Sequence, residues 1–222
     1  MARKGAKKAR KGKGKGRDPR VTLAPDKYLS DDQETRLIRH VRDQADAARQ
    51  RGSTRAVVDE FLIMLLLRSG LRAAEACNLN LGDLPTAHGK PLLYVRNGKG
   101  NVRRTVDVGD KLKDRIRRFV STFRNAAKDD EPLLVNERGG RYGYMSVYGK
   151  VRRLCRAAGI EGRKSPHCLR HTYAGLLYKQ KRDILYVARQ LGHADVSTTM
   201  IYARTFPEKA AEQLAGLEAA DD

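Results

Sequence analysis

Two places in the sequence carry cationic side chains that suit the binding of a phosphate group. Arg72 follows Gly70 by two residues at a predicted helix boundary, where a turn would direct its side chain away from the core. His167 and Arg170 lie three residues apart, so on a helix their imidazole and guanidinium share one face. Arginine suits this role because its planar guanidinium can hold two phosphate oxygens and keeps its charge. For any one of these residues alone, an ordinary solvated side chain is the simpler interpretation.

Two more residues could supply the other groups that metal-free cleavage of a phosphodiester requires, a nucleophile and an acid for the leaving oxygen. Lys99 lies between two glycines at the predicted tip of a hairpin, where the backbone can approach a ligand closely. Tyr202 follows His193 by nine residues and could attack phosphorus if cations or a base assist its phenol, whose ordinary pKa is about 10. A solvated turn lysine and a packing tyrosine are the competing interpretations.

Patterns for other chemistries are missing from the sequence. It contains no acidic cluster with metal-ligand spacing and no P-loop, which predicts that any phosphate chemistry is metal-free. Cys77, Cys155 and Cys168 are far apart and lack CxxC spacing, which disfavours disulfides and structural zinc and favours a reducing cytosol. The longest apolar run, seven residues from Phe61 to Leu67, is much shorter than the ~20 residues that span a bilayer, so we expect no membrane partner.

Hydrophobic periodicity and capping signals predict the elements that would position these side chains. Ser30 and Gln33 form a capping-box pattern before a first helix, and Gly70 ends a second helix that is apolar on nearly all sides. A turn rich in Asn and Gly predicts a β-hairpin over 91–108, and 133–135 could be a short strand. Predicted helices span residues 30–51, 55–69, 72–79, 112–127, 144–158, 168–179, 183–191, 196–204 and 205–219. The expected fold class is mainly α with a small antiparallel β-sheet (α+β).

Two local expectations concern residues beside the candidate site. On the helix of His167 and Arg170, we expect His171 to point to a different face and to be a buried structural histidine. On the helix of Tyr202, we expect Met200 and Ile201 to supply the apolar packing, with the tyrosine on another face.

Charge adds the requirement for an anionic partner. The 222 residues contain 46 Lys and Arg against 26 Asp and Glu, a net charge of +20, which points most simply to nucleic acid. Residues 1–20 hold ten of these cations and a single acid, so we predict a disordered basic tail over 1–27. The tail residues expected to contact the nucleic acid are Lys4, Lys7, Lys8, Arg10, Lys11, Lys13, Lys15 and Arg17.

Taken together, these motifs resemble those of one family, the tyrosine recombinases or phage integrase family. The matching pieces are Ser-Gly-Leu-Arg-Ala-Ala-Glu at 69–75, Gly-Lys-Gly-Asn at 98–101, His-Cys-Leu-Arg-His at 167–171, and Leu-Gly-His-x-x-x-x-Thr-Thr-x-x-Tyr at 191–202. The resemblance covers about residues 28–218. It implies the catalytic-domain fold of that family over 28–222, with a C-terminal helix at 205–219.

The resemblance also implies a metal-free cleavage of double-stranded DNA. Tyr202 would attack a phosphodiester to form a 3′-phosphotyrosine link, while Arg72 and Arg170 hold the phosphate oxygens. Lys99 would protonate the leaving 5′-oxygen. Because the bond energy stays in the phosphotyrosine, a 5′-hydroxyl from another strand could reverse the step without ATP, metal or any other cofactor.

The remaining matched residues have supporting roles in this family. His167 would act on the Tyr202 proton or hold the phosphate, and His193 would donate a further hydrogen bond. Glu75, one helical turn from Arg72, would orient the groups of the active site.

The sequence departs from the family in one respect. Members usually carry an N-terminal helical DNA-binding domain, but only about 29 residues precede the match here, and we expect that domain to be absent. Our hypothesis is that the basic tail partly replaces it through phosphate contacts. By resemblance, the protein would be cytoplasmic and DNA-associated and would form a tetramer on DNA, with the last helix docked on a neighbour or on its own domain.

Site-specific recombination, by integration, excision or resolution, is the leading interpretation of these motifs. A type IB topoisomerase, which relaxes supercoils through the same intermediate, is an alternative within the same chemistry. A non-catalytic DNA-binding protein of the same fold is an alternative of another class, although all six expected catalytic side chains are present.

Overall fold

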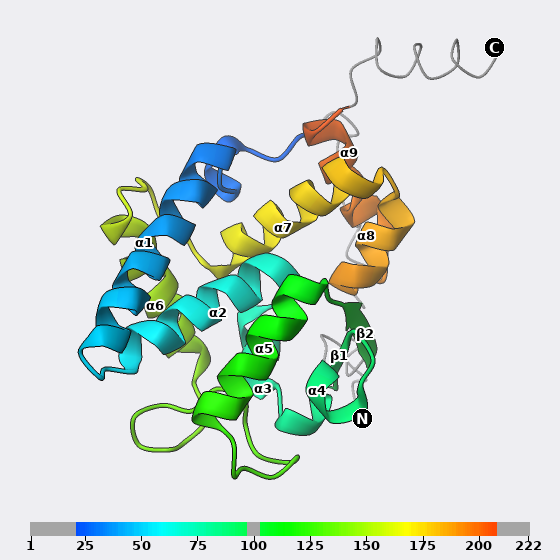
Figure 1. Ribbon diagram of the computed structural model, residues 1–222. Coiled ribbons are helices and arrows are strands. Elements are labelled where there is room, and N and C mark those ends of the chain that lie inside the picture. The colour runs from blue at the N-terminus through cyan, green and yellow to red at the C-terminus, as the bar shows by residue number, and fades with distance from the viewer. Residues whose placement is uncertain (1–20, 97–102, 208–222) are drawn as a thin grey trace, which may run out of the picture.

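Helix α2 (Arg55–Ser69) runs through the middle of the structure, a computed structural model that describes residues 21–96 and 103–207 (Figure 1). The other α-helices described are α1 (Asp31–Gln50), α3 (Ala73–Asn78), α4 (Pro85–His88), α5 (Asp110–Phe123), α6 (Tyr144–Ala157), α7 (Pro166–Lys181), α8 (Ile184–Leu191) and α9 (Met200–Thr205). Short 3₁₀ helices are η1 (Pro25–Lys27), η2 (Leu81–Asp83) and η3 (Val196–Thr198), and the strands are β1 (Leu92–Val95) and β2 (Arg104–Asp107). This arrangement confirms the predicted α+β class.

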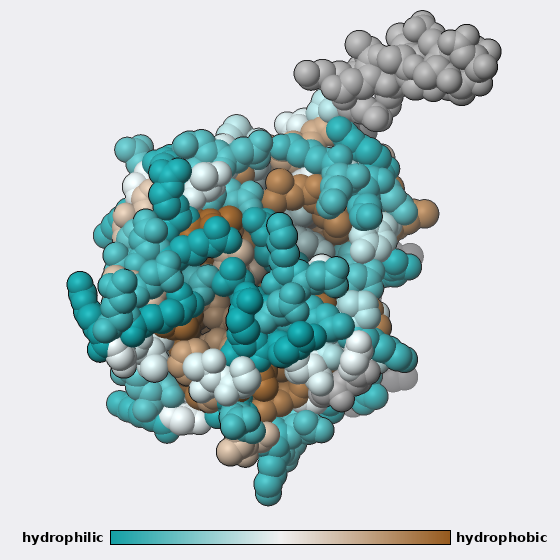
Figure 2. Space-filling view, in the orientation of Figure 1, coloured by the Kyte–Doolittle hydropathy of each residue, from teal (hydrophilic) through white to brown (hydrophobic). Residues whose placement is uncertain are grey.

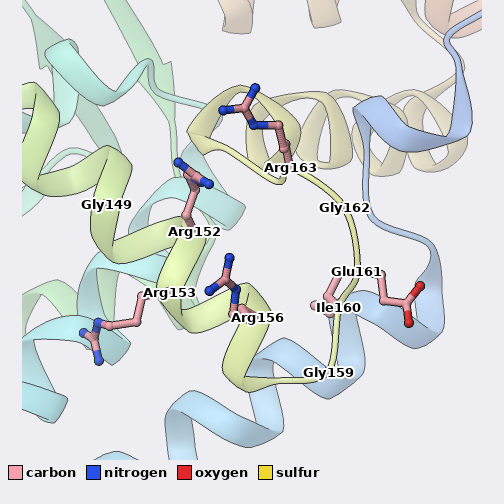
Figure 3. Close-up of a pocket in the computed structure, with 9 residues that line it drawn as sticks. All are labelled: Gly149, Arg152, Arg153, Arg156, Gly159, Ile160, Glu161, Gly162 and Arg163. Carbon is pink, nitrogen blue, oxygen red and sulfur yellow. The ribbon is translucent and has the colours of Figure 1, made fainter.

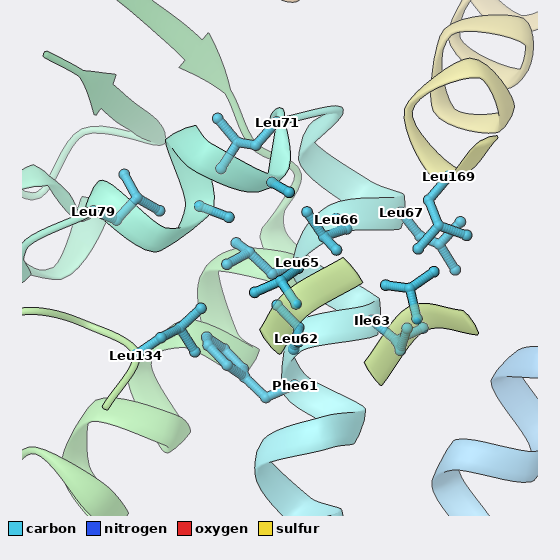
Figure 4. Close-up of a cluster of buried hydrophobic side chains, with 14 of the residues drawn as sticks. Phe61, Leu62, Ile63, Leu65, Leu66, Leu67, Leu71, Leu79, Leu134 and Leu169 are labelled. Carbon is cyan, nitrogen blue, oxygen red and sulfur yellow. The ribbon is translucent and has the colours of Figure 1, made fainter. Parts of the chain in front are cut away.

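The core is centred on α2, because this helix is apolar around its whole circumference. All seven residues from Phe61 to Leu67 are buried, since α1, α5 and α7 pack on different sides of the helix. Figure 4 labels six of these side chains, all except Met64, together with Leu71, Leu79 and Leu134 of the same buried cluster. The helix ends at Gly70, which adopts the left-handed conformation with φ of 61°, as the sequence predicts.

The start of α1 also agrees with the sequence. The Ser30 hydroxyl accepts the backbone N–H of Gln33, and the Gln33 side chain accepts the backbone N–H of Ser30. This reciprocal pair satisfies two of the amide groups that a helix start leaves open.

The predicted hairpin is formed by β1 and β2, which pair antiparallel. Leu93 lies opposite Val106, and both side chains are fully buried, so one face of the hairpin is attached to the core. Residues 97–102 at the predicted turn, Lys99 among them, lie outside the described residues.

The strand predicted at 133–135 is wrong. This segment makes only isolated bridges, between Asn80 and Pro132 and between Val135 and Arg141. The segment that pairs with it, residues 79–81, enters the helix η2 at Leu81. A segment that turns into a helix cannot continue the hydrogen-bond ladder of a strand.

The helix predicted at 196–204 is divided into η3 and α9. Asp195 caps η3 by accepting the backbone N–H of Ser197, as expected of an N-cap. Thr205, where the predicted helix 205–219 begins, is the last residue of α9, and its hydroxyl donates to the carbonyl of Ile201. Most of the predicted helix 205–219 lies outside the described residues.

A second, smaller apolar cluster joins the two ends of the described chain. It contains Leu23, Ala174, Val187, Leu191 and Tyr202, and we call it the Tyr202 pocket.

The N-terminal segment is fastened to this pocket. The backbone N–H of Leu23 donates to the Thr205 hydroxyl at 2.8 Å, and the Leu29 N–H donates to the Thr172 hydroxyl at 2.8 Å. Residues 21–27, which the sequence assigns to the disordered tail, therefore belong to the folded part of the chain, because Leu23 buries its side chain there.

Polar side chains cover most of the face shown in Figure 2, with apolar patches visible between them. Among the helices that the structure describes, none has the length and apolar character needed to cross a bilayer.

Candidate active site

Glu75, on α3, is the centre of a charged cluster that brings three distant arginines together. Its Oε1 accepts Nη1 of Arg72 at 2.7 Å and Nη1 of Arg104 at 2.8 Å. Its Oε2 accepts Nη2 of Arg104 at 2.9 Å and the backbone N–H of Arg72 at 2.8 Å. Nη1 of Arg170 lies 3.7 Å from the same oxygen. We call these four residues the Glu75 cluster, and it unites three residues that the sequence predicted for the site.

The electrostatics of Glu75 are set by opposing effects. Its side chain is only 3% exposed, and this burial by itself raises the pKa of the carboxyl. Hydrogen bonds and charge from Arg104, followed by those from Arg72, outweigh burial and lower the pKa of Glu75 to about 2. The carboxylate is therefore ionised at neutral pH, and three positive charges share one negative charge.

Arg170 is held by main-chain oxygens. Its side chain is 2% exposed, and its two terminal nitrogens donate to the carbonyl of Gly70, at 2.7 Å, and to the carbonyl of Leu191. Burial, followed by the charge of Arg72, lowers the pKa of Arg170 to about 10, so the guanidinium stays charged at neutral pH. Gly70 has room for no side chain, because a Cβ there would lie 2.2 Å from the Tyr173 ring.

Arg104 is a member of the cluster that the sequence analysis missed. Its side chain is only 9% exposed and binds Glu75 through two nitrogens, while its Nε donates to the carbonyl of Gln190 at 3.3 Å. A signal was present in the strand: residues two apart share a face, and Arg104 shares one with Val106, which is fully buried. An arginine on the inward face of a strand needs a buried partner, here Glu75.

A second contact fastens the hairpin to α8. The Gln190 side chain accepts the backbone N–H of Asp107 at 3.0 Å and donates to the Asp107 carboxylate at 2.6 Å. Tyr186 adds a hydrogen bond to the same carboxylate at 3.0 Å. The strand that leads from the predicted turn of Lys99 is thus held against both α3 and α8.

Tyr202 and His171 correct two sequence-based expectations. Tyr202 is only 1% exposed and packs inside its pocket, whereas Met200 is exposed and Ile201 is partly buried. His171 does not point to an unrelated face, because its Nδ1 lies 2.7 Å from the Tyr202 hydroxyl. The side chains meet because α7 and α9 pack together, which residue spacing along the chain does not reveal.

The other two histidines of the predicted site lie beside the charged cluster. His167 is exposed, and its ring contacts that of His171 edge-on with the ring centres 4.4 Å apart. His193 is oriented by a 2.9 Å hydrogen bond between its Nδ1 and the Thr199 hydroxyl. Although His167 is exposed as a whole residue, neighbouring atoms partly desolvate its ring, as they do that of His193. This desolvation, then the charges of Arg170 and Arg72, lower the pKa of both rings, that of His193 to about 4. Both imidazoles are therefore neutral at physiological pH.

Burial raises the pKa of Tyr202 to about 12, with Arg170 opposing part of the rise. The phenol is therefore neutral in the isolated chain and needs further positive charge or a base before it can act as a nucleophile. Arg170 interacts electrostatically with both Tyr202 and Glu75. The arrangement can hold an anionic tetrahedral group beside a phenol hydroxyl. Lys99 and the predicted tail contacts lie outside the described residues.

The fold and this site together define a catalytic domain of the tyrosine recombinase type. The sequence model of a family described as the phage integrase family matches residues 27–209, and the chain belongs to this family.

Individual relatives and solved structures agree with this assignment. The tyrosine recombinase XerC of Thermodesulfovibrio yellowstonii is 35% identical over 150 residues, which cover 65% of this chain and 49% of the relative. The tyrosine recombinase XerA of Pyrococcus horikoshii is 30% identical over 192 residues, which cover 85% of this chain and 60% of the relative.

A crystal structure of a XerA recombinase superposes with a TM-score of 0.65 at 26% identity, over 88% of this chain and 64% of that chain. A structure of XerH bound to its difH substrate before cleavage gives 0.66 at 23% identity, over 88% of this chain and 54% of that chain, and supports the fold. The chain spans about half the length of the curated relatives it matches.

Proposed function

We propose that this chain cleaves and rejoins double-stranded DNA at specific sites through a covalent 3′-phosphotyrosine intermediate. The observation that carries the proposal is the meeting of α3, α7 and α9. There, Arg72 and Arg170 converge on Glu75, and Arg170 is adjacent in sequence to His171, which contacts Tyr202. Family membership supports the assignment.

In the proposed reaction, the non-bridging oxygens of one phosphodiester are bound by Arg72 and Arg170. The Tyr202 oxygen attacks phosphorus, so that an oxygen–phosphorus bond forms while the bond to the 5′-oxygen breaks. Lys99 gives a proton to the departing 5′-oxygen, and the proton of the phenol is taken up by a base, for which the family resemblance names His167. Positive charges fixed before the reaction stabilise the extra negative charge of the transition state.

A groove beside α6 suits the DNA on either side of the cleaved phosphate. It has a volume of about 720 Å³ and is lined by Arg152, Arg156 and Arg163, whose side chains lie along it in Figure 3. Arg153 points away, toward Asp59, to which it is bonded at 2.6 Å. Three residues after Arg163 the chain enters α7, the helix that carries His167 and Arg170. We propose that these arginines bind backbone phosphates.

The basic tail is proposed to add sequence-independent affinity. Residues 1–20 carry ten cations and a single acid, and phosphate contacts of this kind make binding depend steeply on salt. Removal of residues 1–20 should weaken binding and lower the salt slope, while a chain that also lacks Leu23 would disturb the Tyr202 pocket. Equal slopes for the full chain and the chain that starts at residue 21 would contradict this role.

A nicked suicide substrate tests the proposed function, because the loss of a short 5′-fragment traps the covalent complex. We expect a band of increased mass on a denaturing gel with the wild-type chain and none with Tyr202→Phe. The matched control is Tyr142→Phe, a partly buried tyrosine that packs against the main core, and it should form the band. DNA binding without an adduct on any substrate would favour a non-catalytic binding protein.

Two further measurements test whether the chain recombines DNA or only relaxes it, and whether it assembles as a tetramer. Supercoil relaxation without exchange between two marked DNA sites would favour the topoisomerase alternative. Sizing of the complex on a two-site DNA tests the proposed tetramer, which the recombinase assignment suggests.

A further inference from the structure

The Tyr202 hydroxyl is held in place by a residue to which the proposed reaction gives no task. A buried phenol hydroxyl needs a hydrogen-bond partner, because an unsatisfied polar group in an apolar pocket is unfavourable. Tyr202 is 1% exposed among Leu23, Ala174, Val187 and Leu191, and its hydroxyl meets Nδ1 of His171 at 2.7 Å.

The charge states of the two groups in this hydrogen bond follow from their environments. Burial, followed by the charges of His167 and Arg170, lowers the pKa of His171 to about 3. Burial raises the pKa of Tyr202 to about 12. At neutral pH both the phenol and the imidazole are therefore uncharged. We assign the imidazole proton to Nε2, so that the phenol donates its hydrogen bond to Nδ1.

The helix of Tyr202 is too short to fix the hydroxyl by itself. Helix α9 has six residues, and a helix of this length is not stable without tertiary contacts. The apolar pocket and the bond from Leu23 to Thr205 hold α9 and the Tyr202 ring, but the hydroxyl hydrogen could still rotate about the Cζ–O bond. A directional contact, such as that with His171, fixes the hydroxyl hydrogen and thereby orients the oxygen lone pairs that would attack phosphorus.

His171 is well placed to relate the nucleophile to the phosphate clamp. It follows Arg170 directly on α7, and the Arg170 guanidinium is fastened to the carbonyls of Gly70 and Leu191. The ring of His167 supports His171 edge-on from the exposed side. One rigid helix thus carries both the group that holds the phosphate and the group that holds the attacking oxygen.

We propose that His171 is a positioning residue that accepts the hydrogen bond of the Tyr202 hydroxyl and aligns the nucleophile with the phosphate bound by Arg170. The inference rests on the proposed function, since Tyr202 is a nucleophile only if the chain cleaves DNA. Neither the family resemblance nor the family match assigns this role to His171.

Three substitutions separate the hydrogen bond from the volume of the ring. His171→Phe keeps a ring but removes the acceptor. His171→Asn places an amide close to the position of Nδ1, whereas His171→Gln places its amide near Nε2, away from the tyrosine. The matched control is His40→Phe on α1, which is remote from the site.

The main measurement is the rate of covalent complex formation in one turnover with saturating DNA. We expect His171→Phe and His171→Gln to lower this rate about 10- to 100-fold, the usual effect of losing a buried hydrogen bond. His171→Asn should recover most of the rate. The DNA dissociation constant should stay unchanged in all variants, because His171 contacts the tyrosine and not the duplex.

A second measurement does not depend on DNA cleavage. In protein that contains 3-fluorotyrosine, the ¹⁹F resonance missing from Tyr202→Phe identifies Tyr202. This resonance should shift in His171→Phe and stay in place in His40→Phe.

Cleavage by His171→Phe at the wild-type rate, or equal loss in the Asn and Gln variants, would overturn the positioning role. A wild-type chain that cleaves no DNA would contradict the proposed function. The ¹⁹F signal would then decide the contact alone, and an unshifted resonance in His171→Phe would overturn it.

Discussion

The Glu75 cluster and the Tyr202 pocket lie side by side, but different forces hold them together. In the cluster, a carboxylate that is 3% exposed joins guanidinium groups from α3, β2 and α7 through hydrogen bonds of 2.7–2.9 Å and an ion pair of 3.7 Å. In the pocket, a six-residue helix is held by apolar packing and by single hydrogen bonds such as that from Leu23 to Thr205.

The contrast separates two requirements of the proposed reaction. A phosphate clamp works best when its charges are fixed in advance, since reorganising them during the reaction would raise the barrier. The nucleophile instead needs its oxygen oriented toward phosphorus, which an apolar pocket and a single hydrogen bond can provide without further charge. We therefore expect substitutions in the cluster to affect folding and cleavage together, and substitutions in the pocket to change the placement of Tyr202 with little effect on the clamp.

The largest effect is expected from Arg104→Gln, which breaks the paired contact to Glu75. Breaking a buried ion pair leaves one charge without compensation, and the free energy of unfolding should fall by about 3–5 kcal/mol. Covalent complex formation should fall on the order of 10- to 100-fold, because Arg72 loses its fixed partner geometry. Urea unfolding and the suicide substrate measure the two effects. The control is Arg103→Gln at an exposed neighbouring residue. If the two variants behave alike, Arg104 does not contribute to the Glu75 cluster.

Leu23→Ala tests the apolar side of the comparison. Leu23 is 7% exposed in the Tyr202 pocket, and truncation of a buried leucine should lower the free energy of unfolding by about 2–3 kcal/mol. The DNA dissociation constant should hardly change, since the Glu75 cluster stays intact. Val21→Ala, at a side chain that is 48% exposed, should stay within about 0.5 kcal/mol of wild type. A large loss of DNA affinity in Leu23→Ala would show that the two regions are not separable.

Thr205→Val should have a smaller effect, because the shape of the side chain is kept and only its hydrogen bonds are lost. The Thr205 hydroxyl accepts the Leu23 N–H at 2.8 Å and donates to Ile201 at 2.6 Å. We expect a loss of about 1 kcal/mol in the free energy of unfolding, measured by urea denaturation. An unchanged value would mean that water replaces the hydroxyl as a partner of Leu23.

The smallest effects concern the pH range over which each region loses its contribution to stability. His171 has a pKa of about 3 in the fold, below its ordinary value of 6.5, so the unfolded chain binds a proton first as pH falls. Its contribution to stability is complete above pH 6.5 and is lost toward pH 3, by about 1 kcal/mol between pH 7 and 5.5.

Glu75, with a pKa of about 2 against 4.5, loses its contribution only between those two values. Urea midpoints from pH 7 to 5.5 should therefore fall less in His171→Asn than in wild type. If the urea midpoint of the wild type rises as the pH falls, folding would raise the pKa of His171, which would contradict this prediction.

The sequence predicted those features that depend on neighbouring residues. The run of apolar residues in α2 requires burial on every side. The Ser30 capping box begins α1 and the left-handed Gly70 ends α2, both through local contacts. The pairing of Glu75 with Arg72 could be predicted for the same reason, since one helical turn separates the two residues.

The missed contacts join residues that are far apart in the chain. Arg104 and Glu75 are separated by 29 positions, His171 and Tyr202 by 31, and Leu23 and Thr205 by 182. Such pairs depend on how helices pack, which neither periodicity nor capping determines. The inward face of β2 was the one available signal, and it points to Arg104 but not to its partner.

The carbonyl acceptors of Arg170 have a consequence for how this site can change through mutation. The oxygens of Gly70 and Leu191 belong to the main chain, and a point substitution replaces a side chain while leaving the carbonyl in place. The anchoring of Arg170 is therefore insensitive to most coding changes around it. Vulnerability is concentrated at Gly70, where any Cβ would displace the Tyr173 ring and shift the carbonyl itself. In a library of random variants, we expect Gly70 to be among the least tolerant positions, although it carries no functional group.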